Sequence, residues 1–367
     1  NLSVIIQIMT ERTKRLVRMV KRHWLTFGFF LGFITDAILL NRIDDLVDNL
    51  ILLAYVLLAT TAMLLLYVGV AERAPSFLTP ILKKYAPILM QYAFGGLLSG
   101  MLIFYGRSGD WLASAPFYVL ILVVIFGNEF VGKRSDRLIY NIGLYFTGLF
   151  SYIVLVVPVI TGKMGDWMFI ISGVISLMIV WQVVKLLYRI VPNFITANIK
   201  RVIITVGAIY ITFNALYFTN VIPPIPLSLT ELEIVQSVYR TDAGSYRIES
   251  EQQPWYRRLP LTKPLLHPQE GSIACFARVF APTRLSAEIF HRWEYLDEAG
   301  VWQQHLRYGY NISGVNSGGY GGYTKISSFH TGTWRCSVES KRGQVLGRET
   351  FLIDTTGQAG KMEVRYD

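Results

Sequence analysis

Two cysteines carry the clearest covalent chemistry in this chain. Cys275 alternates with apolar residues such as Val279, and Cys336 alternates in the same way with Val338. Alternation places side chains on one face of a strand, so both thiols can face the same core. An oxidising compartment favours a disulfide between them, and two free buried thiols are the alternative. The spacing is not Cys-x-x-Cys, so the sequence does not predict disulfide exchange.

Histidines are the next candidates for chemistry, because four of the five lie in the last third of the chain. His267, His291, His305 and His330 invite a metal interpretation. None is paired at a ligand spacing, however, and no cysteine or carboxylate in the sequence pattern completes a tetrahedral set. The sequence therefore predicts solvated or hydrogen-bonded histidines, with no metal and no cofactor.

Two acidic residues, Asp36 and Glu129, fall inside apolar runs. Carboxylates at membrane depth are functional candidates. Each lies near an end of its run, so both are expected to reach the membrane interface. The predicted topology puts them near opposite faces, which argues against a shared proton or metal site.

A glycine- and tyrosine-rich segment at 317–323 is the most unusual soluble feature. Tyr320 and Tyr323, interleaved with Gly319 and Gly321, could form a mobile platform on which a sugar ring or a partner's aromatic side chain stacks. A flexible hairpin or crossover loop is the alternative. The segment lacks the Lys-Ser/Thr ending of a phosphate loop.

A short motif occurs twice, as GRSGDW at 106–111 and as GKMGDW at 162–167. Glycines permit a tight turn, aspartate can cap the following helix, and tryptophan anchors at a membrane interface. A duplicated helical hairpin and convergence on a good outer turn both explain the repeat. The residues expected to matter are Asp110, Trp111, Asp166 and Trp167.

The elements that must position these residues are mostly membrane helices. The chain is 52% hydrophobic and only 16% charged, below the roughly 25% charged residues of a soluble domain. Seven spans are predicted, at 24–40, 50–70, 88–105, 112–131, 138–160, 167–187 and 202–222. Residues 1–23 combine apolar positions with six basic ones, which predicts an amphipathic helix on an anionic membrane surface, or a protein-binding arm.

Basic residues set the orientation of these spans. The N-terminal arm and the loops on its side of the membrane carry sixteen Lys and Arg, whereas the opposite loops carry only Arg42, Arg107 and Lys163. The positive-inside rule places the N terminus in the cytoplasm, and seven crossings leave the C-terminal domain outside, which in a bacterium is the periplasm. The net charge of +10 is explained by this topology and not by a nucleic-acid site.

After a proline cluster at 223–226, long apolar runs give way to alternating apolar residues punctuated by glycine and proline. The transmembrane domain is therefore assigned to 24–226 and a β domain to 227–367. Strands are predicted at 271–280, 288–295, 301–312, 333–340 and 344–353. The order Cys275, Trp293, Trp334, Cys336 is similar to an immunoglobulin-type core. The expected fold class is a membrane all-α bundle of about seven helices followed by an all-β immunoglobulin-like sandwich.

The C-terminal quarter resembles a bacterial family known as domain of unknown function 2914. The resemblance rests on 291–293 (His-Arg-Trp), 327–329 (Ser-Ser-Phe), 332–336 (Gly-Thr-Trp-Arg-Cys), 343–347 (Gly-Gln-Val-Leu-Gly) and the closing Phe351. Members are often fused to multi-span membrane segments. The family implies no established activity and supplies no catalytic residues.

These features predict a non-enzymatic protein of the bacterial inner membrane that presents a periplasmic β-sandwich as a binding or scaffold module. Its expected partners are the lipid bilayer and a protein of the membrane or periplasm, with a glycan as an alternative ligand, but not nucleic acid. Accessory subunit of a larger complex is the favoured role. The alternatives are a transporter or channel component, in which Asp36 or Glu129 is essential, and a lipid- or glycan-modifying membrane enzyme.

Overall fold

A computed structural model describes residues 24–40, 45–126, 134–224, 226–242, 244–254, 257, 262–268, 271–282, 285–314, 318–357 and 359–367. The predicted surface helix at 1–23 lies outside the described residues. The chain divides into two compact units, which we call the helical unit and the β unit. The helical unit comprises 1–104, 118–157 and 165–214, and the β unit comprises 105–117, 158–164 and 215–367.

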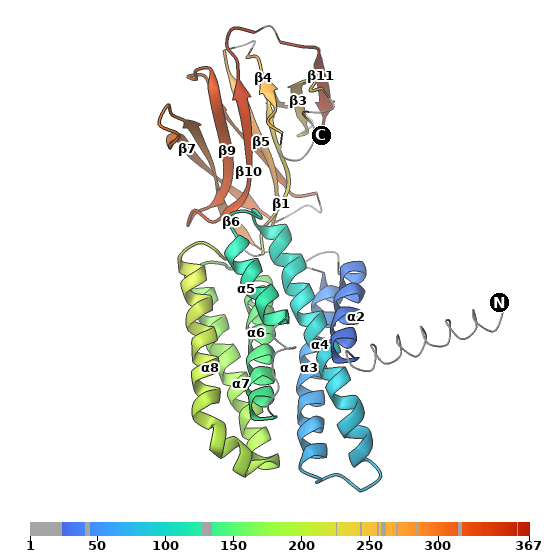
Figure 1. Cartoon of the computed structure of the whole chain (residues 1–367). Helices are drawn as coiled ribbons and strands as arrows, with labels where there is room; N and C mark the ends of the chain where they lie inside the picture. Colours follow the sequence, from blue (N-terminus) through green and yellow to red (C-terminus); the bar gives the residue numbers. More distant parts are fainter. Residues whose placement is uncertain are drawn as a thin grey trace, which may run out of the picture. The chain divides into compact units, whose positions relative to one another are not determined.

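Seven helices precede the strands in the described part of the chain, and each overlaps a predicted span (Figure 1). They are α2 (Trp24–Leu39), α3 (Leu46–Val70), α4 (Thr79–Ser108), α5 (Ala115–Phe126), α6 (Arg134–Thr161), α7 (Asp166–Ile190) and α8 (Pro192–Phe218). Five of them are long and apolar enough to cross a bilayer, namely α3, α4, α6, α7 and α8. The helices α2 and α5 have 16 and 12 residues, short of the roughly 20 that a span needs, so seven crossings remain a proposal.

The C-terminal region is rich in β-structure, and all five predicted strands are found. They are β5 (Ile273–Phe280), β6 (Ser286–Leu296), β7 (Trp302–Ser313), β9 (Gly332–Ser340) and β10 (Val345–Ile353). Six further strands were not predicted: β1 (Ser228–Val235), β2 (Ser237–Arg240), β3 (Tyr246–Glu251), β4 (Leu265–Leu266), β8 (Tyr320–Ile326) and β11 (Met362–Tyr366).

The strands form three sheets, ordered β1-β5-β8, β4-β10-β9-β6-β7 and β11-β3-β2. The five-stranded sheet and the sheet of β1, β5 and β8 contribute side chains to the same core. Residues of one cluster come from both sheets, with Cys275 from β5 beside Trp293, Cys336 and Phe351 from β6, β9 and β10. Each of these four side chains is fully buried. The strand faces that carry them therefore point into the shared core.

Two connections between helices belong to the β unit, although both lie within the predicted transmembrane domain. Residues 105–117 and 158–164 include most of the two repeated turns. The backbone N–H of Asp110 donates to the carbonyl oxygen of Val345 on β10 at 3.2 Å. Met164 packs against the apolar cluster that contains Ile289 and Leu346. Both copies of the motif are therefore tied to the β unit, a role that the sequence did not reveal.

Candidate functional site

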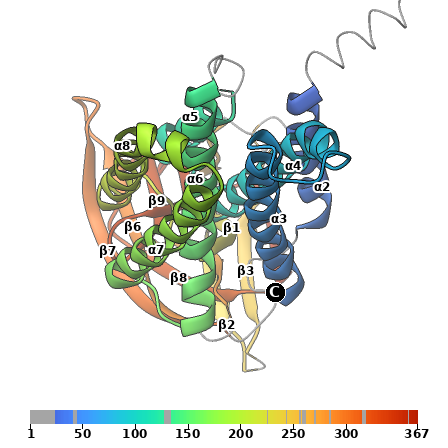
Figure 2. The same ribbon diagram turned by 90° about the horizontal axis from the view of Figure 1, so that it is seen from below.

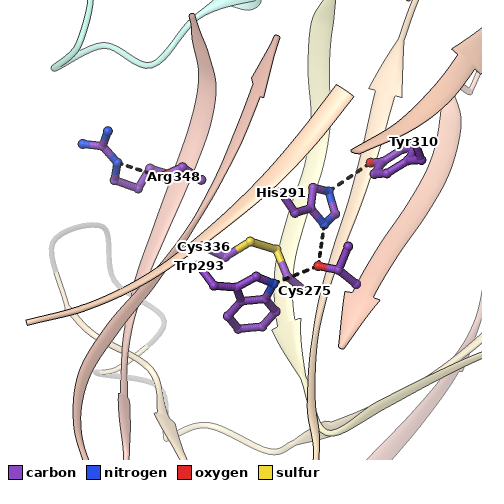
Figure 3. Close-up of a disulfide and its surroundings, with 8 residues drawn as sticks. Cys275, His291, Trp293, Tyr310, Cys336 and Arg348 are labelled. Atoms are coloured by element: carbon purple, nitrogen blue, oxygen red, sulfur yellow. Dashed lines mark hydrogen bonds between the residues drawn. A yellow bond between two sulfur atoms is a disulfide. The ribbon is translucent and has the colours of Figure 1, made fainter. Parts of the chain in front are cut away.

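A disulfide joins Cys275 on β5 to Cys336 on β9 across the core of the β unit (Figure 3). Both residues are completely buried. The alternating pattern predicts this pairing, because each cysteine lies on the apolar face of its strand and both apolar faces point into the core. The bond closes a loop of 61 residues that contains β6, β7 and β8.

His291 lies beside this disulfide and is fully buried as well. Its Nδ1 is 3.1 Å from the hydroxyl oxygen of Thr324, and its Nε2 is 2.9 Å from the hydroxyl of Tyr310. The Thr324 oxygen also accepts a hydrogen bond from Nε1 of Trp293 at 2.8 Å. Both ring nitrogens thus have a partner in the neutral imidazole, and Figure 3 shows Trp293 and His291 converging on this hydroxyl.

The sequence pattern did not show that two cysteines lie near His291 in the fold. One ligand atom each from Cys275, His291 and Cys336 lies within 4.8 Å of the others. In this oxidised form, however, each sulfur is bonded to the other and both ring nitrogens are hydrogen-bonded. The signal that was available is the spacing His291-x-Trp293, which puts both residues on the inner face of one strand.

The three other histidines of the described residues also have partners. Nδ1 of His267 lies 2.8 Å from a carboxylate oxygen of Glu251. The rings of His305 and His330 pack against Trp334, with centroids 5.3 and 5.1 Å away. These three histidines are therefore hydrogen-bonded or packed against an aromatic ring.

The pH response of the core depends on His291. Burial lowers the pKa of this histidine from 6.5 to about 3. The unfolded chain therefore takes up a proton near pH 6.5, whereas the folded chain does not do so until about pH 3. The stabilisation is complete above pH 6.5 and is lost as the pH falls, at about 1.4 kcal/mol per pH unit.

We expect a shift from about pH 7 to about pH 5 to lower the opening free energy of β6 by about 2 kcal/mol more in the native chain than in His291→Gln. Glutamine keeps hydrogen-bonding groups near Thr324 and Tyr310 but does not titrate. Hydrogen exchange of the full-length protein in detergent measures the opening. His305→Gln, at an exposed position, should keep the native pH dependence. Equal pH dependence in the native chain and His291→Gln would contradict the assignment.

The opposite face of the five-stranded sheet carries a row of arginines. Arg307, Arg292, Ser337 and Arg348 stand opposite one another on β7, β6, β9 and β10. Two arginines directly opposite each other repel, so this arrangement costs stability unless carboxylates or a ligand compensate. Arg335 lies one position along the same face, opposite Glu294.

Two buried carboxylates hold these guanidinium groups in place. Arg335 donates two hydrogen bonds to Glu294, at 2.6 and 2.9 Å. Arg307 donates to Glu339 at 2.6 Å, and Nε of Arg292 lies 3.5 Å from both carboxylates. We call the set of Arg292, Arg307, Arg335, Arg348, Glu294 and Glu339 the arginine face. With four arginines and two carboxylates, its net charge is positive.

The charge balance of the arginine face appears in two pKa shifts. Burial raises the pKa of Glu294, but the hydrogen bonds from Arg335 and the charge of Arg292 outweigh burial, and the net shift is downward. The pKa of Arg348 is lowered, first by burial and then by repulsion from Arg335. Arg348 donates to the Ser337 hydroxyl at 3.1 Å. A negatively charged ligand at Arg348 would therefore relieve an unfavourable interaction.

The predicted glycine-tyrosine loop is a strand, and this is a correction. Tyr320, Gly321 and Tyr323 belong to β8, which pairs along its length with β5. A side chain at Gly321 would meet the ring of Tyr246 at 2.7 Å, and one at the next glycine would meet the ring of Tyr310 at 2.4 Å. The glycines therefore make room for aromatic rings across the sheet.

Only part of this segment remains available as a surface. Gly319 precedes the strand with a positive φ of 87°, which suits glycine. Tyr320 is 41% exposed and stacks on Tyr310, whereas Tyr323 is half-buried against Tyr246. A mobile stacking platform is not supported by this arrangement.

The repeated turns differ in how aspartate is used. Asp110 accepts a hydrogen bond from the backbone N–H of Ala113 at 2.8 Å, in the turn before α5. Asp166 is the first residue of α7, directly after the N-cap Gly165. A negative charge in the first turn still favours the helix. Trp111 and Trp167 are 65% and 75% exposed, as interface anchors would be.

Of the two predicted intramembrane carboxylates, the structure describes Asp36 but not Glu129. Asp36 is completely buried between helices, so the expectation that it reaches the interface is wrong. Its carboxylate accepts a hydrogen bond from the Tyr55 hydroxyl and contacts the Ser99 hydroxyl, residues of α3 and α4. Glu129 lies outside the described residues.

Comparisons with known proteins give a family but no activity. Residues 286–353, from the start of β6 to the end of β10, match the family described as Protein of unknown function (DUF2914). No curated protein matches the chain. The alkylpurine DNA glycosylase AlkC of Pseudomonas fluorescens, bound to DNA containing an abasic site analogue, is similar with 9% identity over 86% of this chain and 100% of that chain. Its TM-score is 0.20, too low to carry any argument.

The arginine face, His291 and Cys336 all lie within the matched residues. Residues 286–353, in the C-terminal quarter of this chain, therefore resemble the DUF2914 family.

Proposed function

We propose that this protein is a non-enzymatic binding module of the bacterial inner membrane. Its N terminus is cytoplasmic, its helices cross the bilayer, and its C-terminal domain is an immunoglobulin-like sandwich in the periplasm. In this role it serves as an accessory subunit of a larger envelope complex. The five apolar helices and the buried disulfide support the membrane and the oxidising compartment respectively.

The observation that carries the proposal is the row of Arg307, Arg292 and Arg348 across one sheet face. Adjacent strands are about 4.8 Å apart, so the row presents several guanidinium groups over about 14 Å. Glu339 holds Arg307 and Arg292, and the Ser337 hydroxyl accepts a hydrogen bond from Arg348. Such preorganised arginines lose little entropy when they bind carboxylates in pairs.

An acidic protein surface is the partner that this face fits best. The ring of Trp302 lies 4.0 Å from the guanidinium of Arg335, and the ring of Phe290 lies 3.8 Å from that of Arg307. Arginine and aromatic side chains are enriched at protein interfaces and dominate their binding energy. The flat sheet also suits a broad contact. The histidines of the described region are engaged in the fold, which supports binding rather than catalysis.

The experiment is purification of the full-length protein in mild detergent, with mass spectrometry of the proteins recovered with it. We expect Arg348→Glu to weaken capture of the partner by about 30-fold, because it places like charges at the contact. Lys361→Glu makes the same change of charge at an exposed position directly before β11, which belongs to another sheet, and should leave capture unchanged. Unchanged capture with Arg348→Glu and with Arg292→Glu would overturn the proposal.

A further inference from the structure

Asp36 lies at a junction of three helices in the helical unit, where α2 meets α3 and α4 (Figure 2). Glycines allow the close approach. A side chain at Gly32 of α2 would lie 2.4 Å from the carbonyl oxygen of Tyr92, and one at Gly96 of α4 would lie 2.6 Å from the ring of Tyr55. Small residues at such crossings are typical of tightly packed membrane helices. The carboxyl group is therefore enclosed by packed backbone and rings.

The hydrogen bonds around Asp36 contain more acceptors than the hydroxyl groups can satisfy. Oδ1 accepts from the Tyr55 hydroxyl at 2.7 Å, and Oδ2 lies 2.5 Å from Oγ of Ser99. The same Oγ lies 2.9 Å from the carbonyl oxygen of Gly96. A serine hydroxyl has one proton, and in helices it commonly donates to the preceding turn. If the Ser99 hydroxyl donates its proton to the Gly96 carbonyl, a hydrogen bond between Oδ2 and Oγ requires a proton on the Asp36 carboxyl group.

A metal ion does not fit between these oxygens. Metal–oxygen distances of about 2.0–2.6 Å hold neighbouring ligand oxygens about 3 Å apart. The separation of 2.5 Å between Oδ2 and Oγ is shorter than that. A proton is the one cation that suits this spacing.

Within the part of the chain that the structure describes, the groups that face Asp36 supply no compensating positive charge. The titratable side chains beside it are Tyr55 of α3 and Tyr92 of α4, and α2 contains no other ionisable residue. Arg107, in the last turn of α4, is eight residues from Ser99, or about 12 Å along the helix axis. Asp48 of α3 is seven residues from Tyr55, or about 10 Å, and is negative when ionised. An ionised Asp36 would thus be buried without a cation.

We propose that Asp36 is a proton-binding site that latches α2 to α3 and α4. The protonated carboxyl donates to Ser99 and accepts from Tyr55, which closes the junction. When the proton passes to water, the carboxylate loses its fit to Ser99 and must reach solvent, so α2 separates from α3 and α4. This inference is independent of the proposed binding role of the β unit.

The first measurement is infrared spectroscopy of the full-length protein in lipid nanodiscs, read at the carbonyl stretch of protonated carboxylic acids. We expect a band at neutral pH that Asp36→Asn abolishes. Asp45→Asn removes an exposed carboxylate at the start of α3 and should leave the band unchanged. Absence of an Asp36-dependent band at neutral pH would overturn the proposal. A thermal shift on adding sodium or potassium, without the band, would assign a metal-ion site instead.

The second measurement tests the latch. Spin labels at Ile38 of α2 and Leu89 of α4, both exposed, report the distance between these helices. We expect the distance to lengthen over the same pH range in which the band disappears. Asp36→Asn is a neutral isostere of the protonated acid and should keep the short distance at every pH. A band that titrates without any change in distance would show that the proton is structural only, and would overturn the latch.

Discussion

Replacing both Cys275 and Cys336 with alanine is expected to lower the opening free energy of the β strands by about 4 kcal/mol. The disulfide closes a loop of 61 residues, and a cross-link of that length removes much of the freedom of the unfolded chain. Both cysteines are fully buried in the cluster with Trp293, so the smaller side chains add a packing loss. Hydrogen exchange at β6 and β9 of the full-length protein measures the effect.

Reduction of the native chain is the matched control for this variant. It breaks the same bond but keeps the volume of the cysteine side chains, so the difference between the two samples isolates the packing loss. We expect reduction to account for most of the change. A loss below about 1 kcal/mol in both samples would show that the bond contributes little to the fold.

The helices could be predicted because their sequence signal is local. The spans at 50–70 and 167–187 are apolar runs without basic residues until their ends, and they correspond to α3 and α7. The predicted span at 24–40 matches α2 to within one residue, and α5 begins three residues after the predicted start at 112. The burial of Asp36 was not predicted from the sequence. Its distance from the helix end is short, but neighbouring helices cover it.

The strands that were predicted are those in which apolar residues alternate in the sequence, as Ile273, Cys275, Ala277 and Val279 do in β5, although β5 is buried on both faces. The strand β8 was missed because glycine and tyrosine in succession resemble a loop. Its conformation is set by pairing with β5 and by rings that pack across its glycines, which are contacts distant in sequence. The candidate sites likewise depend on contacts between residues that are distant in sequence.

The arginine face shows what register adds to sequence. Alternation places Arg292 and Glu294 on one face of β6, and Arg335 and Glu339 on one face of β9, and this much is readable from the chain. Which arginine stands beside which carboxylate depends on strand order and on the bulge after Trp293. Only the fold brings Arg307 next to Arg292.

Glu339→Ala is expected to lower the opening free energy of the five-stranded sheet by about 3 kcal/mol. The Glu339 side chain is only 2% exposed, and it lies 2.6 Å from Nε of Arg307 and 3.5 Å from Nε of Arg292. Removal leaves these opposed arginines half-buried and without their shared carboxylate. An unpaired buried charge destabilises a fold by more than a surface salt bridge stabilises it. Glu339→Gln keeps the volume and should show a similar loss, since the missing charge is the cause.

Glu288→Ala is the matched control, because Glu288 lies on the same face of the sheet and pairs with Lys341 at 3.0 Å. The lysine is 79% exposed, so this pair is solvated and its loss should cost at most about 1 kcal/mol. Hydrogen exchange at β7 and β9 distinguishes the two variants. Equal small losses would mean that solvent screens the arginine face as it screens an ordinary surface. A large loss confined to Glu339 would mean that this carboxylate holds the arginines in a position that an acidic partner can use without reorganising them.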